Sequence, residues 1–215
     1  MIKIKNVYLI GLLGIIISSC QSDSKKSTTT KAFEQLIKSQ NGESVEQPDD
    51  YALENSQAKV SYTSDGVSFF NKNESLTCNV IVKQNNHFLE IHFQIFGEES
   101  KAVQINIQKV PLDFKLPLKI PFANLHLTDE DTMQAILTGM DLAAPEASLG
   151  FGIPFEGHLT IKKMNQKNIT FDAVGKGGDY MASENPESWK NIKLNAELIN
   201  PMITTIGIEK SNIFK

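Results

Sequence analysis

Apolar and polar residues alternate along most of the chain from about Val60 onward. A period of two is typical of antiparallel β-strands that bury one face and leave the other in water. Segments such as Ser64-Asp65-Gly66 and Asn85-Asn86 separate the alternating runs and predict tight turns. We therefore expect an antiparallel meander in the first half of this region. Its alternating residues are Val60 and Tyr62, Val67 and Phe69, Leu76 to Val82, Leu89 to Ile95, and Val103 to Ile107.

The alternation continues through Val110–Phe122, but here lysines and prolines occupy the polar positions. Proline has no N–H to give to a sheet ladder, so the segment predicts an edge strand or an extended crossover. Lysine and proline on an outer edge also prevent association through that edge. A docking strip over Phe114–Phe122, for a membrane or a partner, is the functional alternative.

Residues 128–140 depart from this period and predict one short helix, over about 129–140. Thr128 and Asp131 fit a capping box, and the acidic residues between them suit the positive end of a helix dipole. This helix start accounts for the acidic cluster without a metal ion. The apolar residues that follow recur at helical spacing and are Met133, Ile136, Leu137 and Met140.

Strands return in the last third of the chain. A turn at residues 165–168 connects two alternating runs and predicts a hairpin, and residues 175–179 (GKGGD) predict a flexible loop. A further strand is expected at Ile192–Leu198, and a final one at Ile203–Ile208 after the break at Asn200-Pro201. Together the pattern predicts a single all-β domain over residues 57–215, either an antiparallel β-sandwich or a partly closed β-barrel, with one helix.

The first twenty residues have a different pattern, which carries the main functional signal. Two lysines precede an unbroken apolar stretch of eleven residues, Val7–Ile17, which is too short to span a bilayer because that needs about 20 residues. Ser18, Ser19 and Cys20 follow. A positive start, a short apolar middle and small residues are typical of a processed export signal. This segment resembles the lipobox signal of bacterial lipoprotein precursors, which implies removal of residues 1–19 and lipidation of Cys20.

Removal of the signal changes the composition only slightly. The removed segment contains two lysines and no acidic residue, so the formal net charge changes from −4 to −6. The chain lacks arginine and a basic stripe, so nothing indicates nucleic acid binding. With Cys20 lipidated, Cys78 is the one remaining cysteine, and the domain must fold without a disulfide. Cys78 alternates in phase with apolar neighbours, which predicts a buried thiol rather than a nucleophile.

The residues between the signal and the domain, 20–56, are expected to form a tether. Gln21–Thr30 contains no apolar residue, and ten extended residues reach about 33–36 Å. Within Lys31–Gln40, the residues Phe33, Leu36 and Ile37 lie at helical spacing. They predict a short amphipathic helix that packs on the domain or lies on the membrane.

We find no motif that specifies catalysis or a cofactor, and we predict no catalytic, cofactor-binding or metal-binding residue. Ser56 and Lys59 match the sequence pattern S-x-x-K of a serine nucleophile with a lysine. The K-T-G motif that accompanies this pattern in such enzymes is absent from the chain. His87 and His92 are five residues apart in an expected strand and cannot share a metal ion. His126 and His158 lie near strand ends, and the adjacent pair Glu98-Glu99 lies in an expected turn.

These observations favour a lipid-anchored envelope protein, at the outer membrane, that works as a non-enzymatic binding or structural module. A hollow domain would favour a small apolar ligand, and a filled one would favour protein contact. Two alternatives stay open: a hydrolase acting on envelope polymer or polysaccharide, and an accessory subunit of an outer-membrane complex. The face of the membrane, periplasmic or external, also stays open.

Overall fold

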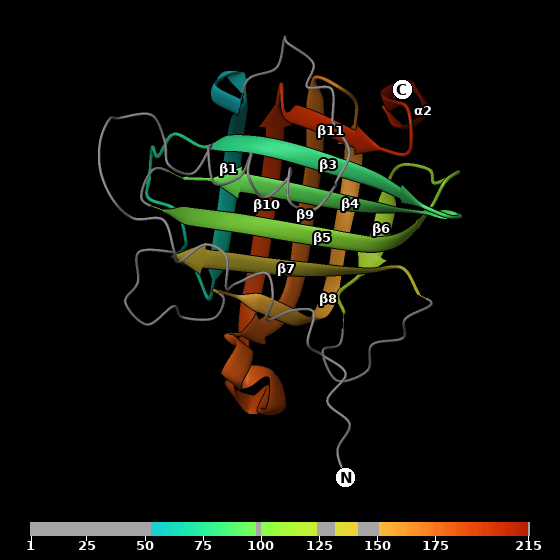
Figure 1. Ribbon diagram of the computed structural model, residues 1–215. Helices are drawn as coiled ribbons and strands as arrows, with labels where there is room; N and C mark the ends of the chain where they lie inside the picture. Colours follow the sequence, from blue (N-terminus) through green and yellow to red (C-terminus); the bar gives the residue numbers. More distant parts are fainter. Residues whose placement is uncertain (1–52, 98–99, 124–131, 142–150, 215) are drawn as a thin grey trace, which may run out of the picture. The chain divides into compact units, whose positions relative to one another are not determined.

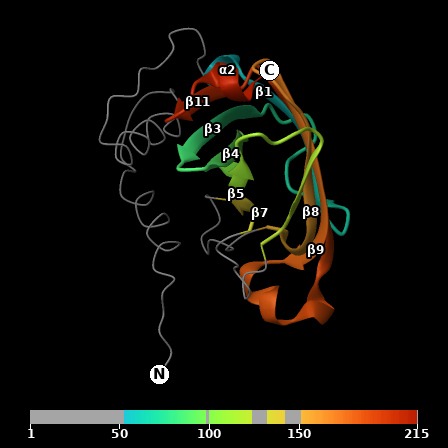
Figure 2. The same cartoon turned by 90° about the vertical axis from the view of Figure 1, so that its right-hand side faces the viewer.

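The alternating residues form eleven strands in two sheets within the part of the chain that the computed structural model describes, residues 53–97, 100–123, 132–141 and 151–214 (Figure 1). All of these residues belong to one compact unit. The strands of the two sheets run across one another, and the sheets face each other over a shared core (Figures 1 and 2). The expectation of an all-β fold is therefore confirmed, and the architecture is a sandwich.

The six-stranded sheet has the order β2-β1-β10-β9-β8-β6, and every neighbouring pair in it is antiparallel. The turns predicted beside its strands are present: Asp65 and Gly66 have positive φ angles between β1 and β2, and the Asn165 side chain closes the turn between β8 and β9. The bounds of its strands are β1 Gln57–Ser64, β2 Val67–Ser68, β6 Leu118–Pro121, β8 Ile153–Met164, β9 Asn168–Gly178 and β10 Lys190–Ile199.

The five-stranded sheet has the order β11-β3-β4-β5-β7. The final strand expected after Asn200-Pro201 is present as β11 and pairs with β3 in parallel, whereas the other neighbours in this sheet are antiparallel. Asn86 has the positive φ angle expected for the tight turn between β3 and β4. The strands are β3 Thr77–Asn85, β4 Phe88–Phe96, β5 Lys101–Pro111, β7 Gln134–Asp141 and β11 Met202–Ile206.

The predicted helix over about 129–140 is wrong where the structure describes these residues, because Gln134–Asp141 forms strand β7. Residues 124–131, which include the expected capping box, lie outside the described residues. Ala135, Leu137 and Gly139 face the core, and Ile136 and Met140 are half-buried on the other side. Both faces of β7 are thus partly apolar, and such a pattern fits helical spacing as well as a period of two.

The predicted loop at residues 175–179 is also wrong, since β9 continues to Gly178. Its glycines allow backbones to approach closely. A Cβ atom on Gly177 would collide with the carbonyl oxygen of Ile153 in β8. Glycine here marks a tight strand contact rather than a flexible segment.

The two sheets meet at one corner, around β7. Gly139 forms an isolated antiparallel bridge with Phe151 and Ala135 a parallel one with Phe122, which joins β7 to the ends of β8 and β6. The centre of the core is filled where Phe93 of β4 stacks on Phe171 of β9, with ring centroids 4.8 Å apart. The expected edge strand is confirmed in β6, which ends the six-stranded sheet with Ile120 buried and Lys119 and Pro121 exposed.

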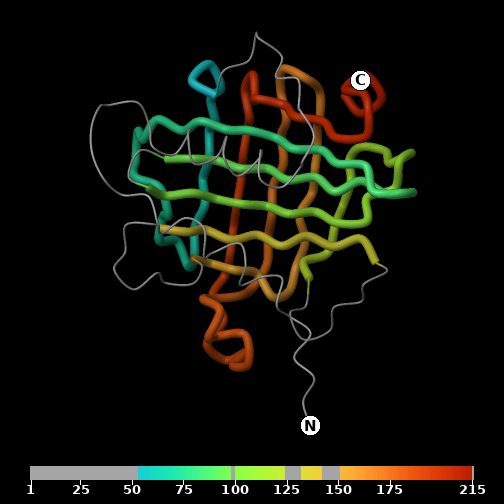
Figure 3. Tube along the Cα trace, viewed as in Figure 1, coloured from blue at the N-terminus to red at the C-terminus, as the bar shows by residue number. Residues whose placement is uncertain are grey.

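Short helical turns lie at the ends of the sheets. The 3₁₀ turns η3 (Tyr180–Glu184) and η4 (Pro186–Ser188) extend from one end of β9 and β10, and helix α2 (Lys210–Ile213) lies at the other end, near β11 (Figure 3). A single 3₁₀ turn, η2 (Leu53–Asn55), precedes β1.

Candidate functional surfaces

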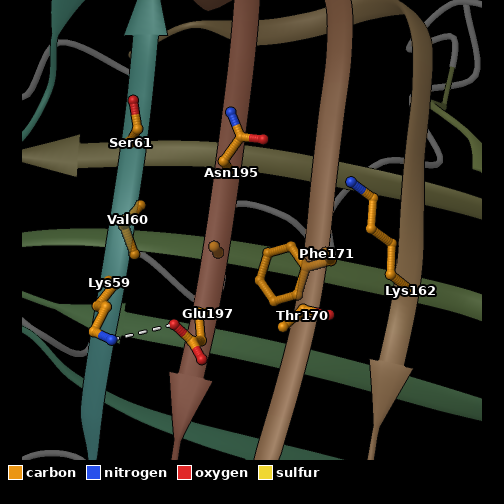
Figure 4. A pocket seen from close by; sticks show the side chains of 9 residues that line it. Lys59, Val60, Ser61, Lys162, Thr170, Phe171, Asn195 and Glu197 are labelled. Carbon is orange, nitrogen blue, oxygen red and sulfur yellow. Dashed lines mark hydrogen bonds and ion pairs between the residues drawn. The ribbon is translucent and has the colours of Figure 1, made fainter.

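The outer face of the six-stranded sheet is polar and carries an open hollow across β1, β10, β9 and β8 (Figure 4). In antiparallel register, Lys59 lies beside Glu197, and Ser61 beside Asn195. The hollow is wide and shallow because short side chains such as Ser61 and Thr170 lie between longer ones. A shallow, open hollow of this kind does not enclose a ligand.

The carboxylates of this face are paired with lysines. Lys59 Nζ lies 3.4 Å from Glu197 Oε2, and Asn168 Nδ2 donates to the other Glu197 oxygen at 2.9 Å. The hydrogen bond from Asn168, together with Lys59, lowers the pKa of Glu197 below its ordinary value. Lys162 pairs with Asp172 in the same way. Because its lowered pKa keeps Glu197 ionised, this carboxylate is poorly suited to act as a general acid at neutral pH.

The S-x-x-K match does not form a nucleophile–base pair. The Ser56 hydroxyl donates to the Leu53 carbonyl at 2.6 Å and accepts from the Cys78 backbone N–H at 2.9 Å, and Ser56 is buried. Lys59 points outward, where its side chain is 72% exposed and bound to Glu197. The two side chains lie in different environments and have different partners. Ser56 therefore has a structural role in this fold, and it does not form a catalytic pair with Lys59.

Cys78 is buried, as predicted, and its thiol is free. Its S–H donates to the Gln57 carbonyl at 3.2 Å. Burial raises the pKa of the thiol to about 11, although hydrogen bonds from Ser56 and the backbone of Ile199 oppose the shift. Because the thiolate is the reactive form of cysteine, this residue is inert at neutral pH.

The histidines are dispersed over the described residues. His92 in β4 has its Nδ1 atom 2.7 Å from Asn106 Oδ1 in β5, whereas His87 lies in the β3–β4 turn and His158 in β8. Within the described ranges, no group of three or more His, Cys, Asp or Glu side chains is placed to hold a metal ion. His126 and the pair Glu98-Glu99 lie outside these ranges.

Exposed apolar side chains gather where β4 begins and β5 ends. Phe88 pairs with Pro111 across the two strands, and Leu112 and Leu116 follow in the connection to β6. Phe88, Leu112 and Leu116 are 36%, 43% and 39% exposed, and we call them the Phe88 patch. Lys109 lies over the Phe88 ring, with Nζ 5.2 Å from the ring centroid. Lys115 and Lys119 of the segment Phe114–Phe122 are exposed in the same connection or directly after it, and the docking role of that segment stays a prediction.

Sequence reasoning missed one feature, on the outer face of the five-stranded sheet. Asn79 in β3 and Gln94 in β4 lie opposite each other in register, and both are buried. In the sequence they are ordinary polar positions of alternating strands, which predicts exposure to water. A signal was present in the apolar residues that share this face, among them Ile81 and Ile136.

The described residues define an all-β sandwich with a filled core, paired surface charges and exposed apolar side chains near several lysines and Asp113. Comparison of the chain with protein-family models, curated proteins and solved structures finds no match. Within the described ranges, no helix has the length and apolar character to cross a membrane. Residues 1–19, Cys20, the tether and the segment Lys31–Gln40, which carry the sequence-based expectation of lipidation, lie outside them.

Proposed function

We propose that the protein is a lipid-anchored lipoprotein of the cell envelope, acylated at Cys20, and that its sandwich is a non-enzymatic module for protein contact. The proposal of a lipid anchor rests on the order of the first twenty residues, which is lysines, a short apolar stretch, two serines and one cysteine. The tether that follows would let the sandwich work away from the lipid headgroups at the outer membrane.

The filled core favours protein contact over binding of a small apolar ligand. Pockets for such ligands are concave and largely enclosed. Two hollows formed by described residues are open, one across the six-stranded sheet and one near Asp65. The interior is occupied by large side chains, with Phe93 stacked on Phe171 at its centre.

The Phe88 patch is the best candidate for the contact surface. It combines exposed apolar side chains with Lys109, Lys115 and Lys119, which lie on or next to the same connection. Apolar residues at the centre and charged ones at the rim are typical of protein interfaces. The partner would be an envelope protein with an apolar spot bordered by acidic side chains, consistent with an accessory subunit of an outer-membrane complex.

Palmitate labelling of cells that express the full chain tests the anchor. We expect label in the parent protein and none in Cys20→Ala, because the lipid is attached through that thiol. The matched control is Cys78→Ser, which removes the other cysteine and should keep the label. Label that persists in Cys20→Ala contradicts the anchor.

Co-purification from detergent-solubilised envelopes tests the contact surface separately. We expect the double change Lys115→Glu and Lys119→Glu to lower recovery of a bound partner, because it reverses the charge at the rim of the patch. The control Lys162→Glu and Lys193→Glu changes the same charge on the outer face of the six-stranded sheet. Equal recovery with both double variants would reject the Phe88 patch and leave the anchor unaffected.

A further inference from the structure

The exposed large apolar side chains of the described residues gather in two places. Three of them form the Phe88 patch. Two more are neighbours in η3, Tyr180 and Met181, which are 48% and 81% exposed. The remaining ones, Val67 and Val174, lie singly in β2 and β9. Because aromatic residues and methionine are enriched at protein interfaces, the pair in η3 indicates a second contact surface.

Hydrogen bonds hold η3 and η4 in one conformation. Asp179 Oδ1 accepts from the Ala182 backbone N–H at 2.9 Å and so caps η3. The Trp189 Nε1–H donates to the Ala182 carbonyl at 2.8 Å, and the Trp189 ring packs on Phe155 of β8. A segment that is already ordered loses little conformational freedom when it binds a partner. We call residues 179–188 the Met181 loop.

The charged side chains of the Met181 loop are all acidic. No lysine lies between Lys176 and Lys190 in the sequence, and both of these lie near carboxylates outside the loop. Lys176 Nζ is 3.9 Å from Glu156 Oε1. Hydrogen bonds from Asn191 lower the pKa of Asp65, and the nearby Lys190 adds to this effect. The exposed apolar pair is therefore bordered by three exposed acidic residues, Asp179, Glu184 and Glu187.

The Phe88 patch carries an excess of the opposite charge. The next charged residues along β3 and β4, Lys83 and Glu90, lie opposite each other in register and balance. Three lysines and one aspartate then remain on the patch or in the connection to β6, so positive charge predominates there. These four residues are Lys109, Asp113, Lys115 and Lys119.

The two surfaces lie on different sides of the molecule. The turns η3 and η4 extend from the lower end of the six-stranded sheet in both views (Figures 1 and 2). The β3–β4 turn, which precedes Phe88, and the connection from β5 to β6 lie at the right-hand edge in Figure 1. A contact between the two surfaces would therefore join two chains. Association through two different surfaces is heterologous, or head to tail.

We propose that the Met181 loop of one copy binds the Phe88 patch of a second copy, so that the chains associate head to tail. This inference rests on the proposed function, in which the Phe88 patch is a contact surface, and it names the partner as the same chain. The apolar side chains of the loop would pack on those of the patch, while its carboxylates would face Lys115 and Lys119.

Charge complementarity selects this arrangement over the other contacts that the two surfaces could make. Contacts between two patches or between two loops would bring like charges together, which costs free energy. A membrane fits the Met181 loop poorly, because anionic headgroups would repel its carboxylates. Each pair of chains leaves one patch and one loop unoccupied, so the association continues into an open chain or closes into a ring.

Charge reversal tests the contact in cells that express two differently tagged copies of the full chain. The loop variant carries Glu184→Lys and Glu187→Lys, and the patch variant carries Lys115→Glu and Lys119→Glu. When both copies carry the same double change, we expect at least about tenfold lower recovery of the second copy with the first from a detergent extract, because like charges then meet.

Co-expression of one loop variant with one patch variant is the decisive arm. A basic loop then meets an acidic patch, and an acidic loop meets a basic patch, so recovery should return to within about twofold of the parent pair. The control Lys162→Glu and Lys193→Glu in both copies reverses two charges on the outer face of the six-stranded sheet. It should leave recovery within about twofold of the parent.

The apolar side of the contact is tested by Met181→Asp in both copies. We expect about tenfold lower recovery, since a charge would enter the centre of the interface. The matched control Val67→Asp changes another apolar side chain, which is 65% exposed, and should stay within about twofold of the parent. Circular dichroism of the purified variants verifies that each keeps its β-structure. If a charge variant fails to fold, the comparison of Met181→Asp with Val67→Asp still decides the result.

The proposal is overturned if the charge reversals leave recovery unchanged, or if the mixed pair does not restore it. It is also overturned if no second copy is recovered with the parent. In that case, loss of a different envelope protein from the patch variant would show that the patch binds this other protein. The proposed function would then stand without the head-to-tail contact.

Discussion

Tyr62 connects three strands through one side chain. It lies in β1, fully buried, and its hydroxyl is 2.7 Å from the Phe151 carbonyl and 2.9 Å from that of Gly152, just before β8. Its ring packs edge-on against Phe151, and Gly139 of β7 leaves room for it, because a Cβ atom there would be 2.9 Å from the ring. Burial raises the pKa of the hydroxyl far above its usual value, so it remains a donor at every physiological pH.

We expect Tyr62→Phe to lower the free energy of unfolding by about 1–3 kcal/mol, because carbonyl acceptors at the corner of the sandwich would lose their buried donor. Urea denaturation followed by circular dichroism measures the change. The control Tyr180→Phe removes the same hydroxyl from a residue that is 48% exposed, and should stay within about 0.5 kcal/mol of the parent. Equal effects of the two substitutions would show that the Tyr62 hydroxyl does not fasten this corner.

At the scale of elements, β6 shows how the chain protects a sheet edge. It pairs with β8 on one side, and among the described strands it has no ladder partner on the other. Lys119 and Pro121 occupy its exposed positions, opposite Thr160 and His158 of β8. A charged side chain and a residue without an N–H oppose pairing with the edge of another molecule.

Replacing these two residues should therefore promote association. We expect the double change Lys119→Val and Pro121→Val to cause concentration-dependent self-association, measured by size-exclusion chromatography with light scattering. The control Thr160→Val and Thr170→Val adds two valines to β8 and β9, which have partners on both sides. If the variant with Lys119→Val and Pro121→Val shows no more self-association than the parent protein at the same concentration, these two residues do not protect the edge of β6.

The elements also show how far the sequence predicts the fold. The period of two predicted most strands from Val60 onward, because one face of each is packed in the core and the other carries more of the polar residues. It failed at β7, where both faces are partly apolar and Gly139 contributes no side chain to the pattern. It failed again at the end of β9, where glycines that usually mark a loop permit close strand contact instead.

The candidate surfaces were less predictable than the strands, since they depend on which segments meet in space. The predicted docking strip contains Lys115 and Lys119, whereas Phe88 is brought next to Pro111, just before this segment, only by the pairing of β4 with β5. Asn79 and Gln94 are buried although the alternation of their strands predicts exposure, and only the apolar residues that share their face, such as Ile81, signal it. Lipidation of Cys20 stays a prediction from the sequence.

At the scale of the whole molecule, the two sheets share one core. Phe93 comes from the five-stranded sheet and Phe171 from the six-stranded sheet, and their stacked rings belong to one buried cluster. The last residues of the described chain, Ile213 and Phe214, belong to the same cluster. Since neither sheet has an apolar core of its own, we expect the sandwich to unfold as a single cooperative unit.

Trp189, the one tryptophan of the chain, allows a direct test of this cooperativity. It contacts Phe155 of β8, with ring centroids 5.4 Å apart, and so reports on the six-stranded sheet by fluorescence, while circular dichroism reports on both sheets. We expect the two probes to give one urea midpoint. Phe93→Leu should move both midpoints down together, since it removes an aromatic contact worth about 1 kcal/mol from the shared core.

The position of the substitution makes the test sharp, because Phe93 belongs to the five-stranded sheet whereas Trp189 packs on Phe155 of the six-stranded sheet. A shift of the fluorescence midpoint by Phe93→Leu can reach Trp189 only through the core that the sheets share. The control Lys193→Leu changes an outward-facing residue of β10 and should move neither midpoint appreciably. If Phe93→Leu shifts the circular dichroism midpoint and leaves that of Trp189 in place, the sheets unfold separately, and a single core no longer explains the stability of the sandwich.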